Sequence, residues 1–295
     1  MSISGEVAAL LAAFLWSVSA VLFGGMADRV SPLGLNFLKG LVAIGCLAIT
    51  IHLTHDPFPW IPSSAILILL LSGAIGIGIG DTFYFGALHT IGSRKTLLMK
   101  ALSPPSAAIG AVIWLQEWLS WQAWGGILLT IAGVTWVIGE RTKTNEPQDF
   151  NGRGLILGLL AALTDALGAV LSRIALTQTP IDPLWSALIR LVGGTIVVVL
   201  ILLCRRQTVF RGERSAMGQT LLTVAAIAFF STFLGIWLQQ IALKATAAGI
   251  AQTLGATSPL FALGIAAIQG KRVTGRSLLG VAIAMGGIAV LLGFR

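Results

Sequence analysis

The sequence predicts an all-α membrane protein: ten transmembrane helices that form two inverted five-helix repeats around a central cavity. Three observations predict this fold, namely the composition, the spacing of apolar runs and a similarity between the two halves of the chain. Hydrophobic residues make up 56% of the 295 residues and charged residues only 10%, with a mean hydropathy of +0.92. A soluble domain typically carries about 25% charged residues. Because this chain lacks the polar residues to cover a water-facing surface, we expect the lipid bilayer to surround it.

Apolar runs of membrane-spanning length follow one another with short connections. The hydrocarbon core of a bilayer is about 30 Å thick, which requires roughly 20 apolar residues in a helix. The runs that we predict to span are 6–27, 33–53, 62–88, 96–116, 121–139, 154–176, 184–204, 219–243, 247–269 and 276–293. No basic segment precedes the first run and it shows no convincing cleavage site, so we expect it to be retained as a helix.

A polar stretch at 140–153 separates five apolar runs from five others. We therefore predict a first repeat at 1–139, a polar linker at 140–153 and a second repeat at 154–295. The two halves have equal numbers of runs, which is the arrangement that a duplicated five-helix unit produces.

Residues that match between the halves support the duplication. Lys39 lies seven residues after a proline, and so does Arg190 in the second half. Residues 101–104 read Ala-Leu-Ser-Pro, and residues 256–259 read Ala-Thr-Ser-Pro. These pairs occur in the same order along each half, as an internal repeat requires.

The loop lysines and arginines fall mostly on one side of the predicted membrane. That side receives thirteen of them, whereas the other side, which carries both termini, receives only Lys244 and Arg295. Cytoplasmic loops carry an excess of basic residues, so we predict that both termini lie outside the cytoplasm. Because each half has five helices, corresponding loops lie on opposite sides, and the repeat is an inverted one. Many transporters build alternating access around a midplane site from such repeats.

Two prolines fall near the centres of the fourth and ninth runs and predict broken helices. Pro104 follows Ser103, and Pro259 follows Ser258. A proline inside a helix removes one backbone hydrogen bond, and in lipid the freed carbonyl needs protein, water or a ligand as its partner. A matched pair of broken helices indicates a substrate site. The alternative is a structural kink in which the neighbouring serine hydroxyl fills the gap.

Several ionisable residues lie within the apolar runs, where a charge at a helix centre costs about 2.5–3.5 kcal/mol unless it pairs or contacts water. They are Lys39, Asp81, Lys100, Asp165, Arg173 and Arg190. The repeat mates Lys39 and Arg190 either extend to the membrane interface or face the cavity, where they favour an anionic group on the solute. Both possibilities stay open at this point.

Asp165 is the deepest of the acids and has no long stem along which to reach water. We predict that it couples transport to protons or holds a cationic group, and an ion pair with a basic residue on another helix is the alternative. Pairing with Arg173 is uncertain, because that residue points away around the same helix. Asp81 and Lys100 lie on adjacent helices near the same cytoplasmic end, so we expect a structural ion pair between them. Lys100 also lies one turn before Pro104 and can border the site.

Polar and aromatic side chains within the runs are further candidates for the cavity lining. Tryptophan near the end of a span is usually an interfacial anchor, but Trp16 lies deeper than that explanation allows. The candidates are Trp16, Ser17, Tyr84, His89, Trp237, Gln239, Gln240 and Gln252.

The sequence argues against several other classes of protein. It contains no nucleophile elbow, no zinc-protease motif, no phosphate-binding loop and no dinucleotide fingerprint, so we predict no enzyme activity, cofactor or metal site. The net charge of +8 lies in loops between apolar runs, which argues against a nucleic-acid partner. The glycine-rich segment 73–80 lies within an apolar run, where small residues favour close helix packing.

The chain resembles the EamA branch of the drug/metabolite transporter superfamily. The resemblance rests on the two five-helix halves, a tryptophan midway along the first helix, and the basic residues placed seven after a proline. It also rests on the segments Gly80-Asp81-Thr82, Ser103-Pro104 and Leu115-Gln116-Glu117. The resemblance implies a secondary transporter in a prokaryotic inner membrane, with the fifth and tenth helices at the periphery. Two features depart from the family pattern: Lys271 stands where a second glutamate is common, and the charge bias places the termini outside.

The resulting expectation is a secondary transporter, an exporter or exchanger of amino acids, organic anions, other metabolites or drugs, present as a monomer or homodimer. The residues expected at its site are Trp16, Lys39, Lys100, Ser103, Asp165, Arg190 and Ser258. An exchanger of phosphorylated metabolites would use Lys39, Lys100 and Arg190. A membrane-embedded enzyme or a non-transporting assembly subunit is the alternative from another class.

Overall fold

The computed structural model describes residues 4–24, 29–54, 60–140, 152–210, 217–270 and 273–293. Within these ranges every named element is helical. The elements are α1 (Gly5–Gly24), α2 (Pro32–Thr54), α3 (Ser63–Gly73), η1 (Ala74–Ile79), α4 (Gly80–Lys100), α5 (Ser103–Leu115), α6 (Trp121–Glu140), α7 (Gly152–Gln178), α8 (Pro183–Arg205), α9 (Met217–Ala228), η3 (Phe229–Leu234), α10 (Gly235–Ala245), α11 (Ala248–Gly255), α12 (Ser258–Ile268) and α13 (Gly275–Gly293). Most of the predicted linker at 140–153 lies outside the described residues.

Several of these elements join end to end into longer rods. Among the described residues, nine helical stretches are long and apolar enough to cross a membrane, and Gly5–Ser19 is a shorter apolar helix. One stretch runs from Ser63 to Gly92, and the next begins at Lys95, because Gly92 takes a φ of 76° that turns the chain. The expectation of an all-helical membrane protein is confirmed, and the rods agree with the apolar runs read from the sequence.

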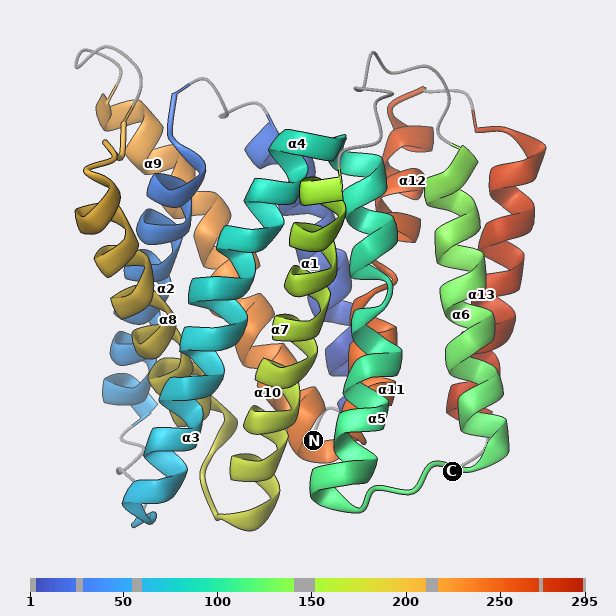
Figure 1. Ribbon diagram of the computed structural model, residues 1–295, viewed down its shortest axis with the longest axis horizontal. Coiled ribbons are helices and arrows are strands. Elements are labelled where there is room, and N and C mark those ends of the chain that lie inside the picture. Colours follow the sequence, from blue (N-terminus) through green and yellow to red (C-terminus); the bar gives the residue numbers. More distant parts are fainter. Residues whose placement is uncertain are drawn as a thin grey trace.

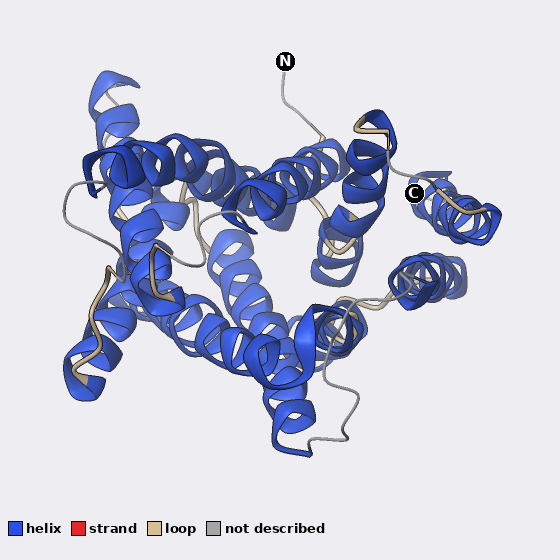
Figure 2. Ribbon diagram, turned by 90° about the horizontal axis from the view of Figure 1, so that it is seen from above, coloured by secondary structure: helices blue, strands red, loops and turns tan. Residues whose placement is uncertain are grey.

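The helices stand roughly parallel, and α6 and α13 lie side by side at one edge of the bundle (Figures 1 and 2). Glycines at their crossing allow this pair to pack closely. A Cβ added at Gly126 would lie 3.1 Å from the carbonyl oxygen of Gly287, and one at Gly280 would lie 3.1 Å from that of Gly133. The two helices therefore form a closely packed pair at the edge of the bundle, and α6 also contributes to the main hydrophobic core.

The glycine-rich segment 73–80 packs against the second half of the chain, as predicted. A Cβ at Gly73 would overlap the backbone carbonyl of Arg190 on α8, and one at Gly76 would lie 3.4 Å from the Cα atom of Gly168 on α7. This contact brings the helix that carries Arg190 close to the third apolar run.

Two π-helical segments occupy comparable places in the two halves. η1 interrupts the rod between α3 and α4, and η3 interrupts the rod between α9 and α10. π-Helical turns are rare and are often found at functional sites. No pattern of apolar residues distinguishes them from an α-helix, so they were not expected from the sequence.

Candidate functional site

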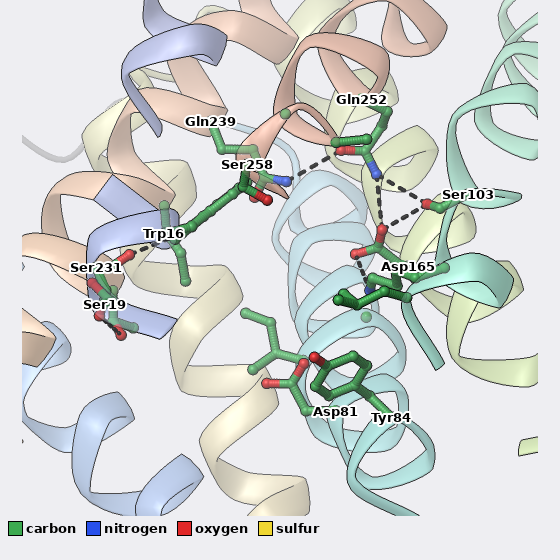
Figure 3. Close-up of a pocket in the computed structure, with 18 of the residues that line it drawn as sticks. Trp16, Ser19, Asp81, Tyr84, Ser103, Asp165, Ser231, Gln239, Gln252 and Ser258 are labelled. Atoms are coloured by element: carbon green, nitrogen blue, oxygen red, sulfur yellow. Dashed lines mark hydrogen bonds and ion pairs between the residues drawn. The ribbon is translucent and has the colours of Figure 1, made fainter. Parts of the chain in front are cut away.

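A cavity of about 410 Å³ lies among the helices and takes its lining from both halves of the chain. Figure 3 shows side chains from α1, α4, α5, α7, α10, α11 and α12 converging on it. The lining includes all the residues singled out for a role: Trp16, Lys39, Lys100, Ser103, Pro104, Asp165, Arg190, Ser258 and Pro259. Of the other candidates, Tyr84, Gln239 and Gln252 line the cavity. Ser17, His89, Trp237 and Gln240 lie elsewhere.

Both broken helices have their break at the cavity wall. α4 ends at Lys100 and α5 begins at Ser103, whereas α11 ends at Gly255 and α12 begins at Ser258. In each case the proline occupies the first turn of the second segment, a position where its missing N–H is not needed. The breaks thus place helix ends, with their polar backbone groups, beside the cavity.

Asp165 on α7 has three partners in the structure. Its Oδ1 atom forms an ion pair with Nζ of Lys100 at 3.3 Å, and its Oδ2 atom accepts hydrogen bonds from Ser103 at 2.6 Å and Gln252 at 3.2 Å. The ion pair with a basic residue on another helix, which the sequence left open, is therefore present. The hydroxyl of Ser103 bonds to this carboxylate and does not fill the helix break.

The expected pair between Asp81 and Lys100 is wrong. Asp81 pairs instead with Lys39 on α2, at 3.1 Å between Nζ and Oδ2. The two residues lie on either side of the turn at Gly92, but Lys100 pairs with a residue of α7 and Asp81 with a residue of α2. Depth can be read from position in an apolar run, whereas the facing neighbour depends on how each helix is rotated.

Arg190 on α8 lies at the cavity but is only 2% exposed. Its Nη1 atom donates to the side-chain oxygen of Gln239 at 3.0 Å, and its buried Nε has no hydrogen-bond partner. Among the described residues, no carboxylate oxygen lies within 4.0 Å of it. Asp165 and Asp81 attract the guanidinium from beyond that distance, so it has negative charge nearby but no direct anionic partner, which is unfavourable for a buried cation. The arrangement can therefore accept an anion from the cavity.

A chain of hydrogen bonds links Arg190 to Asp165 through two amides. Gln239 donates to the oxygen of Gln252 at 3.4 Å, and Gln252 donates in turn to Asp165 (Figure 3). Sequence analysis had placed both glutamines only among many weak candidates. An amide in an apolar run gives no sign of which partners it will meet.

Trp16 on α1 bonds to the π-helical segment of the second half. Its indole N–H donates to the backbone carbonyl of Ser231 in η3 at 2.9 Å. An added Cβ at Gly255, the last residue of α11, would lie 3.5 Å from the indole ring. The deep tryptophan is thus a wall of the cavity and not an interfacial anchor.

A second ion pair joins the two halves of the chain near one end of the helices. Arg173 on α7 donates through Nε to Glu117 at 2.6 Å and through Nη1 to the carbonyls of Leu243 and Lys244 at 2.6 and 2.8 Å. The other oxygen of Glu117 accepts the N–H of Ala248, the first residue of α11, at 3.2 Å. We call this cluster the clasp. Sequence analysis left Arg173 without a partner, because Glu117 lies 56 residues away in a loop.

The model of the EamA-like transporter family matches residues 3–139 and 152–293. The chain belongs to the EamA-like transporter family. The match covers both halves, so the protein is a membrane transporter with two EamA repeats, and the resemblance noted from the sequence is confirmed. Family membership also favours transport over an enzymatic activity.

The chain is also similar to two individual proteins over part of its length and to one solved structure over nearly its whole length. The chain is 29% identical over 123 residues to the S-adenosylmethionine/S-adenosylhomocysteine transporter of Chlamydia muridarum, covering 40% of this chain and 37% of that protein. It is also 29% identical over 140 residues to the uncharacterized protein PA1977 of Pseudomonas aeruginosa, covering 48% and 46%. The chain thus matches less than half the length of these curated relatives. A solved structure described only as a crystal structure of a protein gives a TM-score of 0.78 at 19% identity over 99% of this chain and 98% of that chain, which shows the fold alone.

Proposed function

We propose that this EamA protein is a secondary transporter that carries small anionic or zwitterionic solutes, such as amino acids or organic anions, by alternating access. In this proposal ten helices form two inverted repeats, and the cavity is the substrate site. One observation carries the proposal: Arg190 is a buried cation at the cavity, with an unused N–H and no carboxylate within salt-bridge distance among the described residues.

Charge balance at the cavity supports a solute with a single anionic group. Lys39 is already paired with Asp81, and Lys100 with Asp165. Arg190 is the cation left for the solute, and a guanidinium suits a carboxylate because it can donate two parallel hydrogen bonds. An exchanger of phosphorylated metabolites would need Lys39 and Lys100 as well as Arg190 to bind the phosphate. Because both lysines are paired with carboxylates, the structure favours a solute with a single negative charge.

The remaining groups of the cavity suit the rest of such a solute. Asp165 can hold an ammonium or a proton, and the rings of Trp16 and Tyr84 offer apolar and cation–π contacts. A cavity of about 410 Å³ falls within the usual size of small-molecule sites, about 300–1,000 Å³. S-adenosylmethionine and S-adenosylhomocysteine, which the Chlamydia relative is named for, carry an amino-acid group and belong among the candidates.

The clasp supports alternating access. It ties Glu117 of the first repeat to Arg173 and Ala248 of the second at one end of the bundle. The cavity lining extends toward the opposite end, to Ile138 on α6 and Val198 on α8. Among the described residues, that end carries most of the basic residues at or near the helix ends, namely Arg29, Lys95, Arg153, Arg205, Arg206 and Arg276. We therefore assign it to the cytoplasm of a cell with this protein in its inner membrane. Transport then requires the clasp to open while the cytoplasmic end closes.

The experiment is a thermal-shift screen of the purified protein against amino acids, S-adenosyl compounds, organic anions, organophosphates and cationic drugs. Solutes that stabilise the protein are then tested for counterflow in liposomes. We expect a monocarboxylate or amino acid to bind, Arg190→Gln to lose that binding and Arg190→Lys to retain part of it. Arg205→Gln, at the exposed end of α8, is the matched control. Stabilisation by cationic drugs alone, unaffected by Arg190→Gln, would reject the proposal.

A further inference from the structure

The two amides between Arg190 and Asp165 form a chain in which every hydrogen bond has the same direction. Arg190 donates to Gln239 at 3.0 Å, Gln239 to Gln252 at 3.4 Å, and Gln252 to Asp165 at 3.2 Å. Both glutamines belong to the second repeat, on α10 and α11. Gln252 is only 7% exposed, so the protein largely determines which partners its amide meets.

Each amide in this chain uses its oxygen on one side and its NH₂ group on the other. An amide oxygen only accepts and its nitrogen only donates. One amide therefore cannot turn over unless its neighbour turns as well, since otherwise two donors or two acceptors would face each other. The direction of the chain matches an ionised Asp165, which can only accept.

Protonation of Asp165 changes the end of the chain that fixes the direction of its hydrogen bonds, because a protonated carboxyl group can also donate. The Oδ2 atom then carries a hydrogen and meets two donors, Ser103 and Gln252. The hydroxyl of Ser103 can rotate and accept, because a hydroxyl does both. A neutral carboxyl accepts the hydrogen bond from Gln252 more weakly than a carboxylate does, so Gln252 can turn its oxygen toward Asp165, which points its NH₂ group at Gln239.

The reversal then reaches the other end of the chain. Gln239 must present its oxygen to Gln252 and its NH₂ group to Arg190, so the guanidinium loses its acceptor. We propose that Gln239 and Gln252 are positioning residues that link a proton on Asp165 to an anion on Arg190. This inference rests on the proposed function, in which those two residues bind the proton and the solute. A proton and an anionic solute then favour each other's binding, and the coupling is reciprocal.

Other charges near Asp165 act through space, and their effect must be separated from that of the amide chain. Lys100 on α4 and Arg190 on α8 attract Asp165, and Asp81 and Tyr84 on α4 line the same cavity. Of the other elements packed against α7, α3, η1, α5 and α11 contain no titratable residue. The one charged residue of α10, Lys244, bonds to the carbonyl of Ile181 at 2.6 Å. Removing Arg190 changes the field at Asp165 directly, whereas removing an amide leaves all these charges in place.

A double-mutant cycle on the protonation of Asp165 tests the link without any solute. The pH at which Asp165 is half protonated is followed by the carboxyl stretch in infrared difference spectra, with Asp165→Asn to assign the band. Arg190→Met is measured alone and together with Gln252→Leu. An effect through space is equal in both backgrounds, whereas two sites joined by a physical link deviate from additivity.

We expect Arg190→Met to raise the proton affinity of Asp165 in the wild-type background, because a nearby positive charge is removed. In the Gln252→Leu background, we expect this change in proton affinity to be smaller by at least about threefold. Gln240→Leu is the matched control, because Gln240 is a buried glutamine that bonds to Ser186 and does not line the cavity. Equal effects of Arg190→Met in both backgrounds would overturn the link. This result is independent of the thermal-shift screen, whose failure alone would reject the proposed substrate class.

Discussion

In both broken helices, a second helix segment with proline in its first turn begins after the break, but the side chains at the two breaks differ. At the first break, Lys100 ends the helix, and Ser103, 3% exposed, bonds to Asp165. At the second break Gly255 ends the helix, and the half-buried Ser258 lines the cavity beside Trp16. The first break is thus embedded in a charged network, and the second leaves room beside an aromatic ring.

This difference teaches how a duplicated fold can hold an asymmetric solute. Both repeats supply a proline break, a π-helical segment and a basic residue after a proline. In the first repeat a carboxylate, Asp81, directly follows η1 and its glycine, whereas Ile236 has the corresponding place after η3. Lys39 therefore forms a direct ion pair with an acid, whereas no carboxylate of the described residues lies within 4.0 Å of Arg190. The backbone features thus occur in both repeats, but the side chains differ, and Arg190 leaves a positive charge on one side of the cavity.

The largest expected effect comes from removing the acid at the first break. Asp165→Asn leaves Lys100 without a negative partner and provides no group that gains or loses a proton. We expect flux driven by a pH gradient in liposomes to fall to background while the protein still inserts into membranes. Glu6→Gln, an acid outside the cavity, is the control. Unchanged flux in Asp165→Asn would remove the coupling role from this residue.

A second test compares the two serines directly. Ser103→Ala removes a hydrogen bond to a charged carboxylate, which contributes about 1.5–3 kcal/mol. We expect the apparent affinity for protons in coupled flux to change by about tenfold or more. Ser258→Ala should change it less than about twofold, since Ser258 lies in the second break, away from the charged network. Equal effects at both serines would contradict the distinction between the breaks.

A third test concerns the clasp, which joins the outer ends of the two broken helices. Glu117→Gln weakens a charged hydrogen bond to Arg173, so we expect the conformation with an open clasp to gain population, by about tenfold. The measurement is the labelling rate of a cysteine placed at Ser258, which lines the cavity, with a membrane-impermeant maleimide, in a background where Cys46 and Cys204 are serine. Gln116→Ala is the control. No change in labelling from either side of the membrane would argue against the clasp as a gate.

The smallest effect is expected from the prolines themselves. Both occupy the first turn of a helix segment, where proline mainly restricts the unfolded chain. Pro104→Ala and Pro259→Ala should each lower the free energy of unfolding by about 1 kcal/mol or less. Thermal unfolding in detergent measures this difference. A much larger loss at one site would show that its ring holds the break in place.

The sequence predicted the membrane class, the order of the helices and part of the cavity lining because each depends on local patterns. The apolar runs followed from hydropathy, and Ser103 and Ser258 stood out because proline is rare inside a helix. The ion-pair partners of the charged side chains could not be predicted from the sequence. Lys100 meets Asp165 instead of Asp81 because helix rotation decides the neighbour, and the relation of Glu117 to Arg173 depends on a loop. The segments η1 and η3 look like ordinary helix in the sequence.

One close contact far from the lining sets where the positive end of the cavity lies. Gly73 lies so near the backbone carbonyl of Arg190 that any side chain there would push α8 away. The guanidinium would move with its helix, although Gly73 itself does not line the cavity. In the proposed transporter, solute affinity can therefore be tuned from outside the cavity: a methyl group at this glycine would displace a guanidinium that it does not contact.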